Sequence, residues 1–269
     1  MNNQREKTIN YLKTDLMRHL AHLKYMERYG DAVTCHYLEV DGEPGVLLSH
    51  LSNLSEWDLE FYPKVEAILL PTTSGSPKVI EALVTEAKHQ YDTSASLAVK
   101  FCDPDVRDAF VRVFPLEFAR SYGSYTMNYE GISQLDWSDR VVIGSVMDEQ
   151  LSALYVLNGY SPVSLVHYFE AGGQSFTIYE NETPICSCMT FHNFGAVWEI
   201  GGVHTIEMER GKGYGKQVVA AALATLLTDG RISRYQVSTA NIPSVRLAES
   251  LGMTRCLVFE HYVTFSQNK

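Results

Sequence analysis

Hydrophobic positions along the chain switch repeatedly between a helical period and short strand-like runs. Over residues 3–29 they recur three or four residues apart, which predicts one long amphipathic helix that Gly30 ends. The same spacing predicts further helices at residues 77–89, 104–113, 148–158, 162–169 and 214–227.

Apolar or alternating runs bounded by turn residues predict strands between these helices. The runs occupy residues 33–40, 46–49, 67–70, 97–101, 141–147, 176–179, 184–192, 197–205 and 235–240. Because helices and strands are interspersed throughout, the pattern predicts an α/β or mixed α+β protein.

A polar segment rich in Tyr, Gly and Ser, residues 121–139, interrupts this pattern near the middle of the chain. The 269 residues are enough for one large domain or two modest ones, at roughly 100–200 residues per domain. We therefore expect an N-terminal α/β domain at residues 1–135 and a second domain at residues 136–269.

The composition excludes several classes of protein. A formal charge of −10 disfavours nucleic acid or an anionic membrane as the main partner. The N-terminus is charged and has no apolar stretch, so we expect no secretory signal, and no apolar run approaches the roughly 20 residues of a membrane span. The five cysteines are odd in number and scattered, which favours a cytoplasmic protein without a disulfide framework.

No metal site is predicted. His19 and His22 are three residues apart on the first helix, but no Cys or carboxylate joins them, which favours a packing role. Cys186 and Cys188 lie on one face of a predicted strand and are expected to be small buried side chains.

Two strand–loop–helix segments could bind an anion. The first, residues 67–89, lacks the spacing of a phosphate-binding P-loop and is interpreted as structural. The second, residues 200–227, combines three glycines with three cationic side chains at a helix N-terminus, where free N–H groups and a partial positive charge favour phosphate. These residues are Gly211, Gly213, Gly215, Arg210, Lys212 and Lys216.

The second segment matches neither the dinucleotide-binding nor the Walker A spacing. It resembles the Arg/Gln-x-x-Gly-x-Gly/Ala signature of the GNAT superfamily of N-acetyltransferases, through Arg210-x-x-Gly213-x-Gly215. Asn241 and Ser244, followed by Leu251-Gly252-Met253, are similar to a later block of that family. The resemblance covers residues 140–265 and implies a central mixed sheet flanked by helices.

The resemblance implies that acetyl-CoA is the donor and a small-molecule amine the acceptor. Asn241 and Ser244 would lie on the CoA side, and the strands at residues 197–205 and 235–240 would diverge to admit the thioester. The backbone of Val203 and Thr205 would pair with the pantetheine arm. The pyrophosphate would bind the loop from Arg210 through the amides of Gly211, Lys212, Gly213, Tyr214, Gly215 and Lys216.

Acyl transfer to an amine needs a general base, because an alkylammonium is not nucleophilic. In several family members the base is a Glu eleven residues before the signature Arg, which here is Glu199; the alternative is that Glu199 makes a salt bridge at the strand edge. His204 is a second candidate, and its alternative is a packed or solvent-facing side chain. Many members also carry a Tyr that protonates the leaving thiolate, but this chain has Ala248 at that position.

The N-terminal half carries no such signature. Its mixture of strands and helices resembles a second, degenerate GNAT-like half, as in glycine N-acyltransferase-like proteins. Residues 201–269 carry a charge of +3, so the rest of the chain carries −13, which suits either a cationic amine acceptor or charge that only keeps the protein soluble.

These features together predict a cytoplasmic, acetyl-CoA-dependent N-acetyltransferase. Two alternatives stay open: a catalytically inactive CoA-binding regulatory protein, which the alanine at position 248 would suit, and an acyltransferase for a longer acyl chain.

Overall fold

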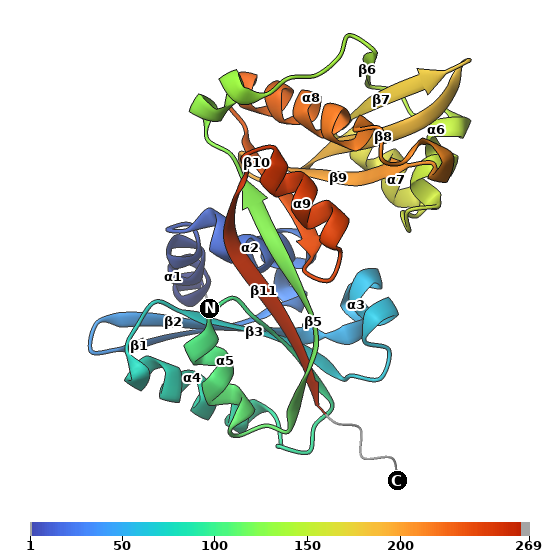
Figure 1. Cartoon of the computed structure of the whole chain (residues 1–269). Helices are drawn as coiled ribbons and strands as arrows, with labels where there is room; N and C mark the ends of the chain where they lie inside the picture. The colour runs from blue at the N-terminus through green and yellow to red at the C-terminus, as the bar shows by residue number, and fades with distance from the viewer. Residues whose placement is uncertain (1, 265–269) are drawn as a thin grey trace. The chain divides into compact units, whose positions relative to one another are not determined.

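The computed structural model describes residues 2–264, and the chain forms two compact units (Figure 1). Unit 1 is Met1–Tyr122 together with Leu257–Lys269, and unit 2 is Gly123–Cys256. The sequence predicts one division, after residue 135. The chain instead passes between the units after residues 122 and 256, because strands β5 (Leu116–Thr126) and β11 (Thr254–Thr264) each have residues in both units.

Unit 1 begins with two helices where the sequence predicts one. Asp15 separates them because its side chain accepts a hydrogen bond from the Arg18 N–H and so starts a new helix. Gly30 ends the second helix with φ +53, and its N–H donates to the Met26 carbonyl. The helices of the unit are α1 (Asn2–Leu12), α2 (Leu16–Tyr29), α3 (Glu56–Phe61), α4 (Pro77–Gln90) and α5 (Pro104–Val111).

The sheet of unit 1 runs in the order β1-β2-β3-β4, and β11 pairs antiparallel with β4. The strands are β1 (Thr34–Val40), β2 (Glu43–Leu51), β3 (Ala67–Thr73) and β4 (Leu97–Phe101). Every residue of β3 and β4 is buried, which explains their continuous apolar runs. These two strands pair in parallel only from Ala67–Leu97 to Leu69–Val99.

The sheet of unit 2 runs in the order β10-β9-β8-β7-β6, with β5 beside β10. Its strands are β6 (Val141–Gly144), β7 (Gln174–Glu180), β8 (Thr183–Phe194), β9 (Val197–Thr205) and β10 (Ile232–Ser238). Its helices are α6 (Glu149–Val156), α7 (Pro162–Glu170), α8 (Tyr214–Thr228) and α9 (Ile242–Ser250). Short 3₁₀ turns at Tyr129–Gln134 and Glu207–Glu209 complete the unit.

Helices cover both faces of the unit 2 sheet. Cys188 belongs to the cluster under α8, whereas its neighbour Met189 belongs to a cluster with Leu151 of α6 and Leu165 of α7. Successive residues of a strand point to opposite faces, so α8 lies on one face and α6 and α7 on the other.

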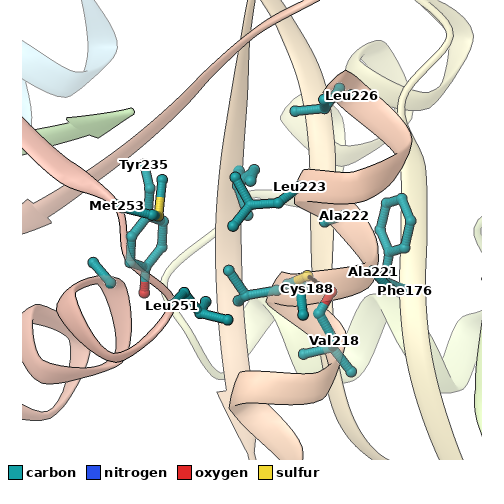
Figure 2. Packing of buried hydrophobic residues seen from close by; sticks show 14 of the residues in the cluster. Phe176, Cys188, Val218, Ala221, Ala222, Leu223, Leu226, Tyr235, Leu251 and Met253 are labelled. Carbon is teal, nitrogen blue, oxygen red and sulfur yellow. Dashed lines mark hydrogen bonds between the residues drawn. The ribbon is translucent and has the colours of Figure 1, made fainter. Parts of the chain in front are cut away.

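The main core of unit 2 lies between α8 and the sheet, and Figure 2 shows its packing. The run Ala220–Ala222 is buried, and its small side chains let the helix approach β7 and β8 closely. Cys188 Sγ lies 3.3 Å from the carbonyl oxygen of Val218. Cys186 and Cys188 are both fully buried, as the sequence predicts.

The described residues contain neither a membrane-spanning helix nor a cluster of metal ligands. Among residues 2–264, no helix has the length and apolar character that a bilayer crossing requires. No group of three or more His, Cys, Asp or Glu side chains in that range is arranged to hold a metal ion.

His19 packs in unit 1, with Nδ1 at 3.0 Å from the Leu12 carbonyl and Nε2 at 3.1 Å from Thr72 Oγ1.

Candidate functional site

The glycine-rich loop of unit 2 leads from β9 into α8 through two left-handed residues. Gly211 has φ +79 and Gly213 φ +80, and Gly213 is the N-cap of α8. A Cβ at either position would meet nothing within 4 Å, so backbone conformation rather than space favours glycine there. Gly215 differs, because a Cβ there would lie 3.2 Å from Leu247 Cδ1.

The start of α8 presents uncommitted backbone donors. In the part of the chain that the structure describes, no acceptor is found for the N–H groups of residues 211–215. The next two, of Lys216 and Gln217, donate to the Gly213 carbonyl at 3.1 and 3.3 Å. Free N–H groups at the positive end of a helix form a ready site for phosphate.

Two of the three cationic side chains of this loop already contact other protein groups. Arg210 Nε donates to the Thr205 carbonyl at 3.1 Å, and Lys212 Nζ pairs with Glu209 at 2.9 Å. Lys216 is exposed and borders a cavity of about 340 Å³ beside the loop. The residues that line it are Gln134, Asp136, Gly213, Lys216, Gln217, Ser250 and Leu251.

Strands β9 and β10 pair in parallel over only part of their length. The register runs from Val197–Ile232 to Ile200–Tyr235. In that register, residues 201–205 of β9 have no partner on β10. The pairing of β9 with β8 also shifts at this point, and Gly202 has φ +63, which marks a bulge. The strands therefore diverge where the sequence predicts an opening.

Glu199 is held at this divergence by three donors. The residue is buried, at 7% exposure. Oε2 accepts from Arg234 Nη1 at 2.6 Å and from Asn193 Nδ2 at 2.8 Å, and Oε1 accepts from the Gln236 N–H at 3.0 Å. A carboxylate offers about four lone-pair sites, so three of those of Glu199 are occupied by protein donors.

His204 lies on the part of β9 that pairs with β8 but not with β10, and it is half-buried. Burial lowers the pKa of its imidazole, and the nearby Arg210 charge lowers it further. The ring is therefore neutral at pH 7 and can accept a proton.

The predicted Asn241–Ser244 block forms a helix cap. Asn241 is the N-cap of α9, and its Oδ1 accepts from the Ser244 N–H at 3.3 Å. Burial raises the pKa of Tyr235 to about 12, and a hydrogen bond with the Ser244 side chain opposes this shift. Ala248 is fully buried in the core.

The structure brings two further residues to the site that the sequence did not indicate. Arg234 is the register partner of Glu199 on β10. Tyr160, between α6 and α7, accepts a hydrogen bond at its hydroxyl from the Gly202 N–H at 3.0 Å. Two β9 residues that are predicted to bind acetyl-CoA have carbonyls that already contact side chains. Arg210 Nε donates to the Thr205 carbonyl, and Asn158 Nδ2 lies 3.5 Å from the Val203 carbonyl oxygen.

Unit 1 contains a similar strand–loop–helix arrangement, and there the donors are used internally. The Ser76 N–H donates to Glu43 Oε2 at 2.7 Å, and the Gly75 N–H donates to Thr73 Oγ1 at 2.8 Å. These two bonds occupy the amides that lead into α4.

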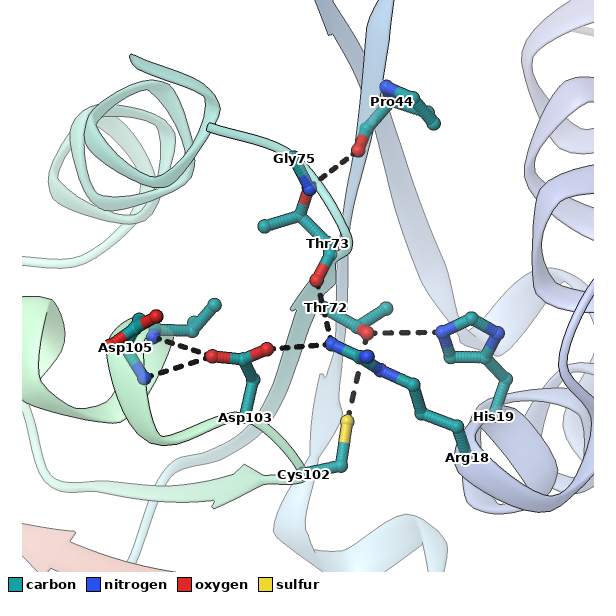
Figure 3. A network of polar contacts seen from close by, with 10 residues as sticks. Arg18, His19, Pro44, Thr72, Thr73, Gly75, Cys102, Asp103 and Asp105 are labelled. Atoms are coloured by element: carbon teal, nitrogen blue, oxygen red, sulfur yellow. Dashed lines mark hydrogen bonds and ion pairs between the residues drawn. The ribbon is translucent and has the colours of Figure 1, made fainter. Parts of the chain in front are cut away.

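In unit 1, the pairing of β3 with β4 ends at Leu69–Val99, and polar side chains connect the residues beyond that point (Figure 3). Arg18 Nη2 lies 2.7 Å from both the Thr73 carbonyl and Asp103 Oδ2. Asp103 in turn caps α5 by accepting from the Asp105 and Val106 N–H groups. The loop that the sequence suggested to be structural thus bonds within its own unit.

The sequence of unit 2 matches a family of known proteins. Residues 136–253 match the acetyltransferase (GNAT) family. They form a GNAT acetyltransferase domain. No curated protein matches the sequence.

Solved structures share the fold of the GNAT domain and of much of unit 1. An acetyltransferase of the GNAT family from Colwellia psychrerythraea has a TM-score of 0.59 at 13% identity, covering 93% of this chain and 97% of that one. A GCN5-related N-acetyltransferase from Kribbella flavida has a TM-score of 0.55 at 16% identity, covering 86% of this chain and 90% of that one. A tandem GNAT protein from the clavulanic acid biosynthesis pathway has a TM-score of 0.56 at 10% identity, covering 93% of this chain and 89% of that one. The fold class predicted from the sequence is confirmed.

Proposed function

We propose that the GNAT domain transfers an acetyl group from acetyl-CoA to the amino group of a small, cationic molecule. The observation that carries this proposal is the set of uncommitted N–H groups at residues 211–215, at the positive end of α8 and next to the diverging end of β9. Such donors suit the pyrophosphate of CoA, and the open strand edge suits an extended amide arm.

The residues that would bind the donor follow from this arrangement. The amides of the loop, with Lys216 beside them, would hold the pyrophosphate. For the pantetheine arm to pair with β9, Arg210 and Asn158 would have to leave the Thr205 and Val203 carbonyls. Arg210 would then be free to pair with a phosphate oxygen.

The chemistry is direct acyl transfer. The amine nitrogen adds to the thioester carbonyl, the C–N bond forms, and the C–S bond breaks to release the CoA thiolate. A base takes the proton that the amine loses. His204 is neutral and half-buried, whereas Glu199 is tied to Arg234, so His204 is the better placed of the two predicted bases.

A second function is favoured by two observations. Glu199 is committed to three donors, and Ala248 offers no hydroxyl to the leaving thiolate. Both would suit a protein that binds CoA to regulate something else and performs no transfer. The longer-chain acyltransferase and the cytoplasmic location stay predictions from the sequence.

Calorimetric titration tests the donor site first. We expect micromolar binding of acetyl-CoA, with CoA close to it and no heat from NADH. Thiol release is then followed over a panel of amines. Binding with no turnover on any amine would favour the regulatory protein, and no binding of either CoA species would reject the donor site itself.

A further inference from the structure

Tyr160 places a hydroxyl at the point where β9 leaves β10. It lies in the connection between α6 and α7, and its ring meets those of Tyr155 and Tyr168 edge-on, each with centroids 6.5 Å away. The Gly202 N–H donates to Tyr160 Oη at 3.0 Å. Ile200 is the last residue of β9 that pairs with β10, so this contact is made just beyond the end of that pairing.

The backbone of β9 is shaped around this hydroxyl. A Cβ at position 201 would lie 2.6 Å from Tyr160 Oη, so only glycine leaves room for it. Gly202 has φ +63, and a Cβ there would lie 2.9 Å from the ring of Tyr155. Two consecutive glycines in a strand mark a place where something approaches the backbone closely, and here it is the phenol.

Among the described residues, the hydroxyl of Tyr160 has a single hydrogen-bond partner, the Gly202 N–H. A phenol donates one hydrogen bond and can accept others, and Tyr160 accepts from Gly202. Within residues 2–264, no group accepts from Tyr160 Oη. Burial raises the pKa of Tyr160, and the charge of Glu199 raises it further, so the hydroxyl stays protonated at neutral pH.

We propose that Tyr160 donates its hydrogen bond to the carbonyl oxygen of the acyl group. This inference rests on the proposed function. When the amine adds, the electron pair of the C=O bond moves to oxygen, and that oxygen becomes negatively charged. A preorganised donor stabilises this charge more than it stabilises the neutral thioester.

The step leaves Tyr160 unchanged. The C=O bond re-forms, the C–S bond breaks, and the electron pair leaves with the CoA sulfur as the thiolate. The proton of the amine passes to the base, and Tyr160 keeps its own proton throughout. Its role is thus separate from that of His204 or Glu199.

Tyr160→Phe tests the proposal, because it removes the hydroxyl and keeps the ring. Tyr155→Phe is the matched control: its hydroxyl lies 2.7 Å from Ser187 Oγ and donates to the Cys188 carbonyl, inside the core. We expect Tyr160→Phe to lower kcat about 100-fold. We expect Tyr155→Phe to lower the melting temperature and to keep kcat near that of the wild type.

Binding measurements separate a direct contact from a structural effect. CoA lacks the acyl carbonyl, so Tyr160→Phe is expected to weaken acetyl-CoA binding relative to the wild type and to leave CoA binding unchanged. An unchanged kcat in Tyr160→Phe, or an equal loss of acetyl-CoA and CoA binding, would overturn the proposal. A wild-type protein that binds no acetyl-CoA or transfers no acetyl group would instead overturn the proposed function on which it rests.

Discussion

Glu199 and Arg234 face each other as register partners on β9 and β10, and Arg234 Nη1 donates to Glu199 Oε2 at 2.6 Å. Both side chains are 9% exposed. Arg234 also reaches Ser124 Oγ at 3.1 Å, which ties β10 to β5. The pair thus joins three strands just before β9 and β10 diverge, and it holds the closed end of the opening.

Removing the charge of Glu199 is expected to destabilise the GNAT domain. Glu199→Gln leaves the guanidinium of Arg234 buried without a counter-charge, at a cost of about 3 kcal/mol. Chemical denaturation of the wild type, Glu199→Gln, Arg234→Gln and the double variant measures this cost. We expect the double variant to recover part of the stability that each single variant loses.

The same four proteins separate the two roles of Glu199. If Glu199 only holds the strands, kcat recovers with stability in the double variant. A double variant that is stable and binds acetyl-CoA, but turns over as slowly as Glu199→Gln, would identify Glu199 as the base.

Substitutions at Gly213 are expected to affect the donor site in two distinguishable ways. Gly213→Ala places a Cβ on a left-handed residue and costs about 1 kcal/mol of stability. Gly213→Asp adds a negative charge among the free N–H groups and should also weaken acetyl-CoA binding roughly tenfold. Gly230→Ala is the matched control, with φ +69 and no atom within 4 Å of a Cβ, at the other end of α8. Calorimetry and thermal melts on the three variants check this, and equal affinity in Gly213→Asp and wild type would contradict the anion site.

The rate of acetyl transfer is expected to fall at acidic pH, because His204 becomes protonated there. Burial and Arg210 lower the pKa of the imidazole below 6.5, so the neutral, proton-accepting form dominates at pH 7. We expect kcat/KM to be constant near neutral pH and to decline below the depressed pKa. Arg210→Ala removes a positive charge, so its acid limb should move to higher pH. A profile that keeps the same acid limb in His204→Gln would show that another group takes the proton.

Each chain is expected to bind one molecule of acetyl-CoA. Unit 1 repeats the strand–loop–helix arrangement, but Glu43 occupies the Ser76 amide and Arg18 bridges Thr73 to Asp103. The stoichiometry from calorimetry should therefore be one, and Arg210→Ala should weaken that single site. Glu43→Gln is expected to leave both the stoichiometry and the affinity unchanged. A value of two in the wild type would show that the Arg18 bridge opens.

The local sequence pattern is sufficient to predict the limits of a strand where the strand is apolar and bounded by turns. The predicted limits 97–101 and 197–205 coincide with β4 and β9. The prediction of a single helix over residues 3–29 is wrong at Asp15. The side chain of Asp15 caps a new helix there, although the helical spacing of apolar residues continues past it. Part of β5 falls within the predicted polar segment, and β11 had no prediction, because both strands are polar or mixed and depend on partners distant in sequence.

The anion-binding loop was visible in the sequence, and its surroundings were not. Glycines and cations at residues 210–216 reveal a loop by their type alone. The Glu199–Arg234 pair spans 35 residues, and the Tyr160–Gly202 contact spans 42, so each depends on how the strands and helices assemble. Parallel register brings the first pair together, and a bulge in β9 brings the second.

The crossing of β11 into unit 1 affects the order in which the chain can fold during synthesis. Domains usually fold one after another from the N-terminus as the ribosome produces them. Here residues 257–264 belong to unit 1, so all of unit 2 must emerge before β4 gains its antiparallel neighbour. Until then the nascent unit 1 carries an unpaired strand edge, a surface that chaperones would have to shield, while the contiguous unit 2 can close first.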